Sequence, residues 1–169
     1  EAKDTPIILV GYSYGRFVSH LYTSKYPDKV KGMLLIDPPH HDWIQTMKRE
    51  MNSEDWSKIQ GILDWFLKYK GHNVWDTQFE VEKATIPNDM PIIIITRGLD
   101  ETKIKKAELS EAGFRQFNDI HFKHQVELET LTSRTTRIIA PKSEHLILNF
   151  EPKIAIDAFA ELNKSISMN

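Results

Sequence analysis

The chain has 169 residues, of which 40% are hydrophobic and 27% charged, and its formal net charge is -2 at pH 7. That length and balance suit one globular domain and leave little room for two. Charges of both signs are mixed along the chain without a basic block, so no nucleic-acid partner is expected. There is no cysteine, which excludes disulfides, thiolate metal sites and a cysteine nucleophile and fits a reducing, cytoplasmic compartment. No apolar run is long enough to predict a membrane span.

A Gly-x-Ser-x-Gly pentad at residues 11–15 lies between a predicted strand (7–11) and a predicted helix (15–26). The strand is apolar without polar alternation, which indicates a parallel sheet with both faces covered. A chance pentad in a loop is the alternative interpretation. A strand before the pentad and a helix after it favour a nucleophile elbow, in which a serine stands on a sharp turn.

Ser13 is the apex of the predicted turn. The turn imposes a positive φ on Ser13, and we expect that side chains at Gly11 and Gly15 would clash with the crossing backbone. The Ser13 hydroxyl then stands clear of the sheet at a helix N-terminus. There the backbone N–H of Tyr14 can face a developing oxyanion.

A second apolar strand at 32–36 ends at Asp37, and strand, helix and strand in so short a span predict a right-handed βαβ unit. A further strand is predicted at 91–96, and a long polar and helical stretch follows at 103–133. A last short strand at 137–140 leads to a closing helix that begins near Pro152.

Residues 41–87 have an amphipathic helical pattern and contain all four tryptophans of the chain. Their apolar faces either pack on the sheet or form a lid over a pocket. We favour an inserted lid, because the parallel-strand pattern resumes only afterwards. The prediction is therefore one domain over 1–169, with a core of 1–40 and 88–169 and a helical lid of 41–87.

Four residues with reactive side chains follow the carboxyl ends of the four predicted strands: Ser13, Asp37, Asp100 and His145. Ligands of open parallel sheets bind at that edge. A serine nucleophile needs a base to take its proton, and the base needs a carboxylate to fix its tautomer. Serine, then acid, then histidine is the chain order of the α/β-hydrolases.

The sequence resembles the C-terminal portion of an α/β-hydrolase fold protein. The resemblance rests on the pentad at 11–15, on Leu34-Leu35-Ile36-Asp37-Pro38 as the next strand end, and on Ser143-Glu144-His145 as the histidine loop. It implies a mostly parallel α/β sheet with flanking helices and an inserted lid, with Ser13 as nucleophile and His145 as general base. The resemblance also implies an ester-type substrate and no cofactor. The aromatic residues of the predicted lid suggest that this substrate is small and apolar.

The acid that orients His145 is either Asp100 or Asp37. Asp100 is preferred, because it follows the penultimate strand, where the family usually places the acid, although Gly98-Leu99-Asp100 is one residue shorter than the common pattern. Asp37 is the alternative acid. Its purely structural interpretation is that it forms a turn before two prolines. His72, His121 and His124 show no metal-ligand spacing with carboxylates, so no metal is expected. His40 and His41 are candidates for the pocket mouth and His20 for a structural role.

Two expected parts of the fold are missing from the sequence. The second oxyanion donor of the family comes from a loop well before the elbow, and earlier strands should flank residues 7–10. We therefore expect the N-terminal strands to be absent and residues 7–10 to lie at a sheet edge, with the missing segment as a possible separate partner chain. The alternative to a serine hydrolase is a catalytically silent protein of this fold that binds a ligand or a partner.

Overall fold

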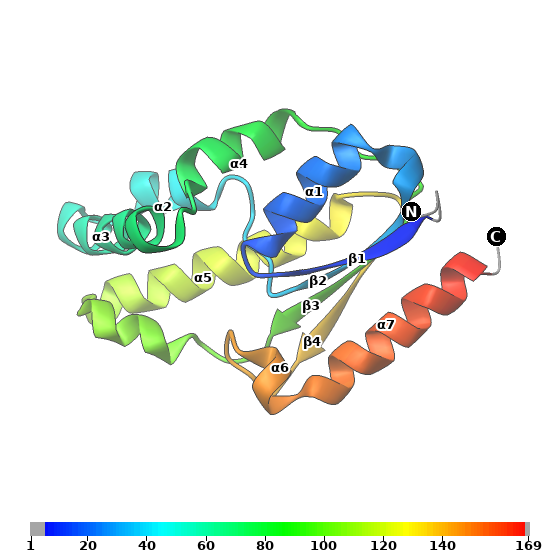
Figure 1. Ribbon diagram of the computed structural model, residues 1–169. Coiled ribbons are helices and arrows are strands. Elements are labelled where there is room, and N and C mark those ends of the chain that lie inside the picture. Colours follow the sequence, from blue (N-terminus) through cyan, green and yellow to red (C-terminus); the bar gives the residue numbers. More distant parts are fainter. Residues whose placement is uncertain (1–5, 168–169) are drawn as a thin grey trace.

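A computed structural model describes residues 6–167, apart from the side chains of 105 and 106. Its centre is a four-stranded sheet in which every neighbouring pair is parallel and the order is that of the sequence (Figure 1). The strands are β1 (Ile7–Tyr12), β2 (Val30–Ile36), β3 (Ile92–Arg97) and β4 (Thr135–Ala140). The α/β class and the parallel sheet predicted from the sequence are confirmed.

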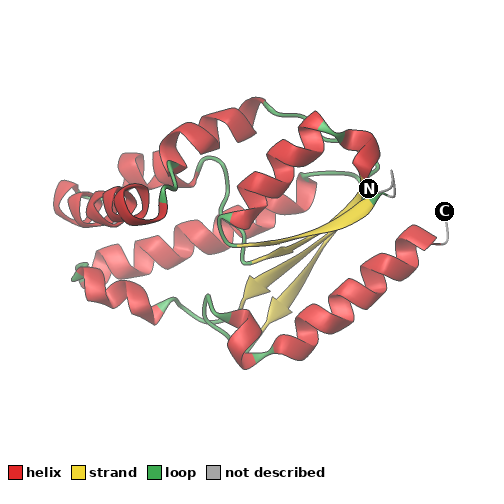
Figure 2. Cartoon of the chain, in the orientation of Figure 1, coloured by secondary structure: helices red, strands yellow, loops and turns green. Residues whose placement is uncertain are grey.

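Helices cover both faces of the sheet, as the secondary-structure colouring in Figure 2 shows. Helices α1 (Gly15–Lys25) and α5 (Glu111–Glu127) lie on one side and α7 (Pro152–Ser167) on the other (Figure 1). The remaining helices are α2 (Trp43–Glu50), α3 (Ser53–Lys70), α4 (Val74–Lys83) and the short α6 (Ile147–Phe150). Short 3-10 turns occupy 27–29, 102–107 and 128–130. Within residues 6–167, no helix is long and apolar enough to cross a membrane.

The two middle strands form the best-buried part of the sheet. Every residue of β3 is buried, and alternate side chains of β2 and β3 enter two separate hydrophobic clusters, one on each face. Leu34 and Ile95 face α7, whereas Leu35 and Ile94 face the opposite layer. A strand buried on both faces reads as continuous apolar sequence, which is why the isoleucine run of β3 predicted it correctly.

Strand β1 differs from that pattern because it lies at the edge of the sheet. Among the described residues it pairs with β2 alone, and the side chains of Ile7 and Val10 are 44% and 53% exposed. Ile8 and Leu9 still pack against the clusters on opposite faces, so the expected cover of both faces is only partial for β1, and the expected edge position is confirmed. The continuous apolar sequence of β1 suits a more enclosed place than it has here.

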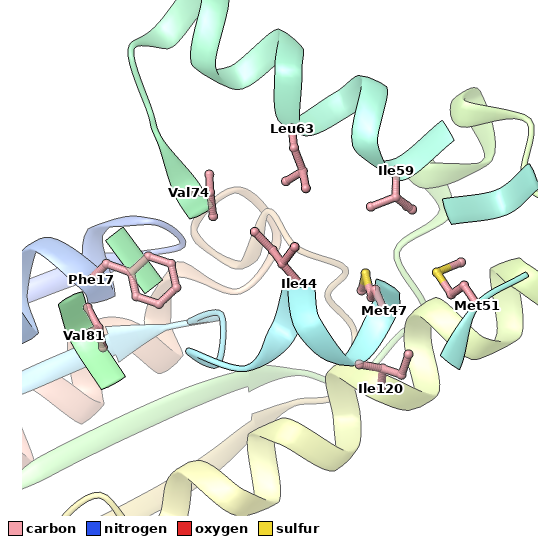
Figure 3. Packing of buried hydrophobic residues seen from close by; sticks show 9 residues of the cluster. All are labelled: Phe17, Ile44, Met47, Met51, Ile59, Leu63, Val74, Val81 and Ile120. Carbon is pink, nitrogen blue, oxygen red and sulfur yellow. The ribbon is translucent and has the colours of Figure 1, made fainter. Parts of the chain in front are cut away.

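Helices α2, α3 and α4 pack on one another and on α1 and α5 rather than on a face of the sheet. Their shared cluster of buried residues is drawn in Figure 3: Phe17, Ile44, Met47, Met51, Ile59, Leu63, Val74, Val81 and Ile120. Figure 1 shows α2 and α3 on the side toward which the strands point. The predicted helical character of 41–87 is confirmed, and this group of three helices covers that end of the molecule.

Local signals explain where these helices begin and end. The Asn52 side chain accepts hydrogen bonds from the N–H groups of Glu54 and Asp55, so it caps α3, whose first residue is Ser53. Gly71 ends α3 with a φ of 67°, which glycine adopts without strain. The closing helix begins at Pro152 as predicted.

Candidate active site

The elbow at residues 11–15 has the strained turn that its sequence predicts. Ser13 has a φ of 52°, and its N–H donates to the Ile36 carbonyl at 2.9 Å, which ties the turn to β2. A Cβ built on Gly11 would lie 2.9 Å from the Gly15 carbonyl carbon, so the clash expected at Gly11 is confirmed. The clash expected at Gly15 is wrong, because a Cβ there would have no atom within 4 Å. Only the glycine before the serine is therefore sterically required.

Tyr14 links the elbow to the helices above it. It is the N-cap of α1, so its backbone N–H precedes the helix and has no intrahelical acceptor. Its ring stacks on His72 at 4.3 Å between centroids and 3° between planes. The Tyr14 hydroxyl shares a 2.8 Å hydrogen bond with Thr77 of α4. The residue after Ser13 is thus held from both α4 and the loop before it.

His145 pairs with Asp37. The Nδ1 of His145 lies 2.6 Å from Asp37 Oδ2, in a short hydrogen bond whose donor is the ring nitrogen when Asp37 is ionised. The Asp37 side chain is fully buried and that of His145 is 32% exposed. Asp37 has a φ of 42°, a left-handed conformation that aspartate tolerates better than most residues. Its N–H donates to the Ile95 carbonyl at 2.7 Å, so the neighbouring strand holds it in place.

The expected pairing of Asp100 with His145 is not present. Asp100 is exposed and has no hydrogen bond within residues 6–167. The backbone explains the difference, because the N–H groups of Gly98 and Leu99 bind the Ser143 carbonyl at 3.2 and 3.1 Å and fix the loop path. It is the next residue, Glu101, that reaches the histidine loop, where it accepts the His145 backbone N–H at 2.9 Å. Asp37, the alternative acid, occupies the position beside the ring.

Asp37 is surrounded by cations and hydrogen-bond donors. Arg97, buried at the end of β3, donates its backbone N–H to Oδ1 at 3.2 Å and Nη1 to Oδ2 at 3.3 Å. His121 Nε2 of α5 lies 3.1 Å from Oδ1. Burial alone would raise the pKa of Asp37, but the close His121 and His145 rings and the charge of Arg97 hold it below its usual range. Asp37 is therefore ionised at neutral pH.

Tyr12 places the His145 ring next to the elbow. The two rings stack with centroids 5.1 Å apart, and the Tyr12 hydroxyl donates to the His145 carbonyl at 3.1 Å. Burial and the charges of Asp37 and Glu101 raise the pKa of Tyr12 to about 12, so the hydroxyl keeps its proton. Ser13 Oγ has no hydrogen-bond partner among the described residues.

Sequence reasoning missed three residues of this arrangement: Arg97, His121 and Glu101. Arg97 directly follows the most apolar run of the chain, at 92–96. A charged residue at that point could have indicated a partner for a nearby carboxylate. His121 lies within a helix with no motif around it, so only the packing of α5 on the strand ends brings it to Asp37.

The residues His40, His124 and Glu127 are the group within 6–167 whose side chains could converge on a metal ion. The Nε2 atoms of His40 and His124 lie 4.0 and 3.9 Å from Glu127 Oε2. However, the Asp42 N–H donates to His40 Nδ1 at 3.1 Å, so the proton of the neutral ring is on Nε2, where a metal would bind. Burial is the main cause that lowers the pKa of His40, with smaller effects from the charges of His41, His124 and Arg16, and the buried Arg16 guanidinium disfavours a cation there. The proton on His40 Nε2 and the nearby charge of Arg16 therefore disfavour a metal at this group.

Comparisons with known proteins identify the fold. A family model described as alpha/beta hydrolase fold matches residues 2–70, which include the elbow and Asp37. The fold matches a probable hydrolytic enzyme from Pseudomonas aeruginosa with a TM-score of 0.59 at 14% identity, over 94% of this chain and 63% of that one. It matches an epoxide hydrolase from Bacillus megaterium with a TM-score of 0.56 at 10% identity, over 95% and 70%. The chain has an α/β-hydrolase fold.

A third structure, NosK from Streptomyces actuosus, matches with a TM-score of 0.52 at 12% identity, over 96% of this chain and 70% of that one. No curated protein matches the sequence. The chain thus spans roughly two thirds of the length of these α/β-hydrolase structures, and at such low identity they show its fold alone.

Proposed function

We propose that this chain carries the serine-hydrolase machinery of an α/β-hydrolase, with Ser13 as nucleophile, His145 as base and Asp37 as the acid that orients His145. The proposed substrate has an ester-type bond, and the proposed reaction passes through an acyl-enzyme. One observation carries the proposal: a buried, ionised Asp37 lies 2.6 Å from His145 Nδ1, beside a serine on a strained turn.

The proposed chemistry follows from the roles of the two ring nitrogens. Asp37 accepts the Nδ1 proton, so Nε2 of the neutral ring is free to take the proton of Ser13 as the oxygen attacks the acyl carbon. The backbone N–H of Tyr14 donates to the oxyanion that forms. His145 then returns the proton to the departing alcohol, and water releases the acyl group by the same steps.

The helical segment 41–87 is proposed as a lid that meets an apolar part of the substrate. Three of its tryptophans (Trp43, Trp56 and Trp75) pack against the shared cluster of Figure 3, whereas Trp65 is 47% exposed at the end of α3. The stack of Tyr14 on His72 joins this segment directly to the elbow. A small apolar ester is therefore the substrate class we propose.

A fluorophosphonate probe, which reacts with activated serines, tests the proposal. We expect the chain to be labelled and Ser13→Ala to be unlabelled, with p-nitrophenyl esters of short acids hydrolysed only by the unmutated chain. Labelling that persists in Ser13→Ala would contradict the assignment of the nucleophile. A folded chain that neither reacts with the probe nor cleaves esters would favour the silent ligand- or partner-binding alternative.

We also propose that the free edge of β1 receives a further parallel strand from outside residues 6–167. The exposed Ile7 and Val10 and the unpaired backbone of β1 support this proposal. The second oxyanion donor of the family would come with such a segment. A monodisperse chain that unfolds cooperatively as a monomer and hydrolyses esters unaided would contradict the need for that partner.

A further inference from the structure

His121 is a buried histidine that the proposed chemistry does not use. It lies on α5 with 7% of its surface exposed, and its Nε2 is 3.1 Å from Asp37 Oδ1. The ring is not aligned for a good hydrogen bond at that distance, and Nε2 has no other partner within the described chain. A buried ring nitrogen without an aligned partner is costly, so its closeness to a carboxylate calls for an explanation.

The contacts of Asp37 show which lone pair His121 faces. Oδ2 interacts with His145 Nδ1 and with Arg97 Nη1, at 2.6 and 3.3 Å. Oδ1 accepts only the Arg97 backbone N–H, at 3.2 Å, as an aligned hydrogen bond. An ionised carboxylate oxygen accepts more than one hydrogen bond, so Oδ1 has acceptor capacity left on the side of His121.

The charges around this carboxylate decide what His121 can contribute. Arg97 already supplies a buried positive charge to Asp37. Burial lowers the pKa of His121, and the charges of Arg97 and His145 act in the same direction, whereas Asp37 raises it. At neutral pH the His121 ring is therefore uncharged and brings an N–H donor rather than a second cation.

We propose that His121 is a positioning residue that fixes the carboxylate of Asp37 through Oδ1, so that Oδ2 stays aimed at His145. The inference rests on the proposed function in taking Asp37 as the acid. Donors of this kind are often poorly aligned in the empty site and tighten as charge develops. The His121 N–H would align when His145 becomes positively charged and draws Oδ2 toward it. Its effect belongs to the turnover step rather than to substrate binding.

The direct test is the proton NMR resonance of the His145 Nδ1–H, assigned by its loss in His145→Gln. A short hydrogen bond to a carboxylate moves this resonance far downfield of ordinary amides. The matched variants are His121→Gln, whose amide N–H reaches about as far as Nε2, and His121→Asn, whose amide is too short. We expect the resonance to remain in His121→Gln and to move upfield or broaden in His121→Asn.

Kinetics supply the second readout. The kcat for ester hydrolysis is expected to fall roughly 10- to 100-fold in His121→Asn with KM nearly unchanged, the range for a lost hydrogen bond to a charged group. His121→Gln should recover most of that loss. An unmoved resonance and an unchanged kcat in His121→Asn would overturn the proposal. Equal losses in both variants, with a lowered unfolding temperature, would also overturn it, because His121 would then be a packing residue.

The two proposals fail in different ways. If the unmutated chain does not react at Ser13 but the His145 resonance still depends on the residue at 121, the hydrolase proposal fails and the positioning role stands. If Ser13 reacts normally and the resonance ignores residue 121, the positioning role fails and the hydrolase proposal stands.

Discussion

At the scale of single residues, Asp37 has the most unusual environment in the molecule. It combines a left-handed backbone, complete burial of its side chain and contacts to His145, Arg97 and His121. Such a group is stable as an anion only while all these partners are present, because an unpaired buried carboxylate costs several kcal/mol (roughly 3–5 for a broken pair). Asp37 and its partners therefore behave as one unit.

Asp37→Asn is expected to lower kcat by several orders of magnitude, roughly the 10⁴-fold known for the equivalent change in serine proteases. The amide presents an N–H toward His145 Nδ1 and stabilises the wrong tautomer. Asp100→Asn is the matched control, and turnover there should stay near that of the unmutated chain, because Asp100 is exposed. Steady-state kinetics of both variants test this assignment of the acid. Near-normal turnover in Asp37→Asn with a large loss in Asp100→Asn would instead identify Asp100 as the acid.

Buried histidines make stability depend on pH. Burial first, with the charges of Arg16 and His41, lowers the pKa of His20 from 6.5 to about 4, and its ring hydrogen-bonds the Ala84 carbonyl. Between those values the unfolded chain binds a proton that the folded chain does not. The stabilisation is therefore complete above pH 6.5 and is lost as the pH falls toward 4, by about 3 kcal/mol for this residue.

Urea unfolding between pH 8 and pH 5 measures this effect. We expect the free energy of unfolding to fall on acidification, and His20→Gln to show a shallower fall, because glutamine does not titrate. At pH 8 no protonation difference remains, so the pH-linked term should vanish there. An equally steep acid dependence in His20→Gln would show that other groups cause it.

Residue-level prediction from the sequence reached Ser13, Tyr14 and His145 as candidates through local motifs, and the structure places the elbow and the histidine loop as those motifs require. It preferred Asp100 to Asp37, whereas Asp37 lies beside the His145 ring, because the choice depends on how the loop after β3 turns. That path is set by hydrogen bonds to Ser143, more than 40 residues away in sequence.

At the scale of elements, the contact between the ends of β3 and β4 positions the histidine loop. The Gly98 N–H donates to the Ala140 and Ser143 carbonyls, at 2.8 and 3.2 Å. A Cβ on Gly98 would lie 2.7 Å from Pro141 Cα and 2.8 Å from the Ala140 carbonyl oxygen, both of them backbone atoms. Two chain segments can approach so closely only where one lacks a side chain.

Gly98→Ala is therefore expected to destabilise the protein by about 1–3 kcal/mol and to lower turnover through a displaced His145. Gly61→Ala is the matched control, because a Cβ there meets nothing within 4 Å. That change, inside α3, should stabilise the protein by about 1 kcal/mol. Urea midpoints of the two variants measure both effects. Equal stability in both would contradict the close packing of Gly98.

Periodicity identified the elements well where their sequences are long and regular. The isoleucine run gave β3, and Pro152 gave the start of α7. The pattern for 41–87 predicted helices, but it did not predict which other elements these helices contact. Their cluster includes Phe17 from α1 and Ile120 from α5, and such distant pairings leave no periodic trace in the sequence.

At the scale of the whole molecule, the sheet with its flanking helices differs in character from the helical segment 41–87, whose α2 and α3 lie at the end toward which the strands point. The sheet is apolar and covered by α7 on one face and by α1 and α5 on the other, whereas α2, α3 and α4 share a cluster with α1 and α5 (Figure 1). The elbow lies where these parts meet, through the stack of Tyr14 on His72. Any movement of 41–87 away from the core must first break that stack.

The edge position of β1 has a consequence for how the protein opens. β3 is bonded to a strand on each side, whereas β1 is bonded to β2 alone, so half of its amides face away from any ladder. In native-state hydrogen exchange followed by NMR, we expect amides of β3 to exchange slowest and outward amides of β1 to exchange within the dead time. Protection of β1 equal to that of β3 would contradict this. The serine thus follows one of the two edge strands of the described sheet, and a segment that pairs with β1 would slow exchange beside the nucleophile as it binds.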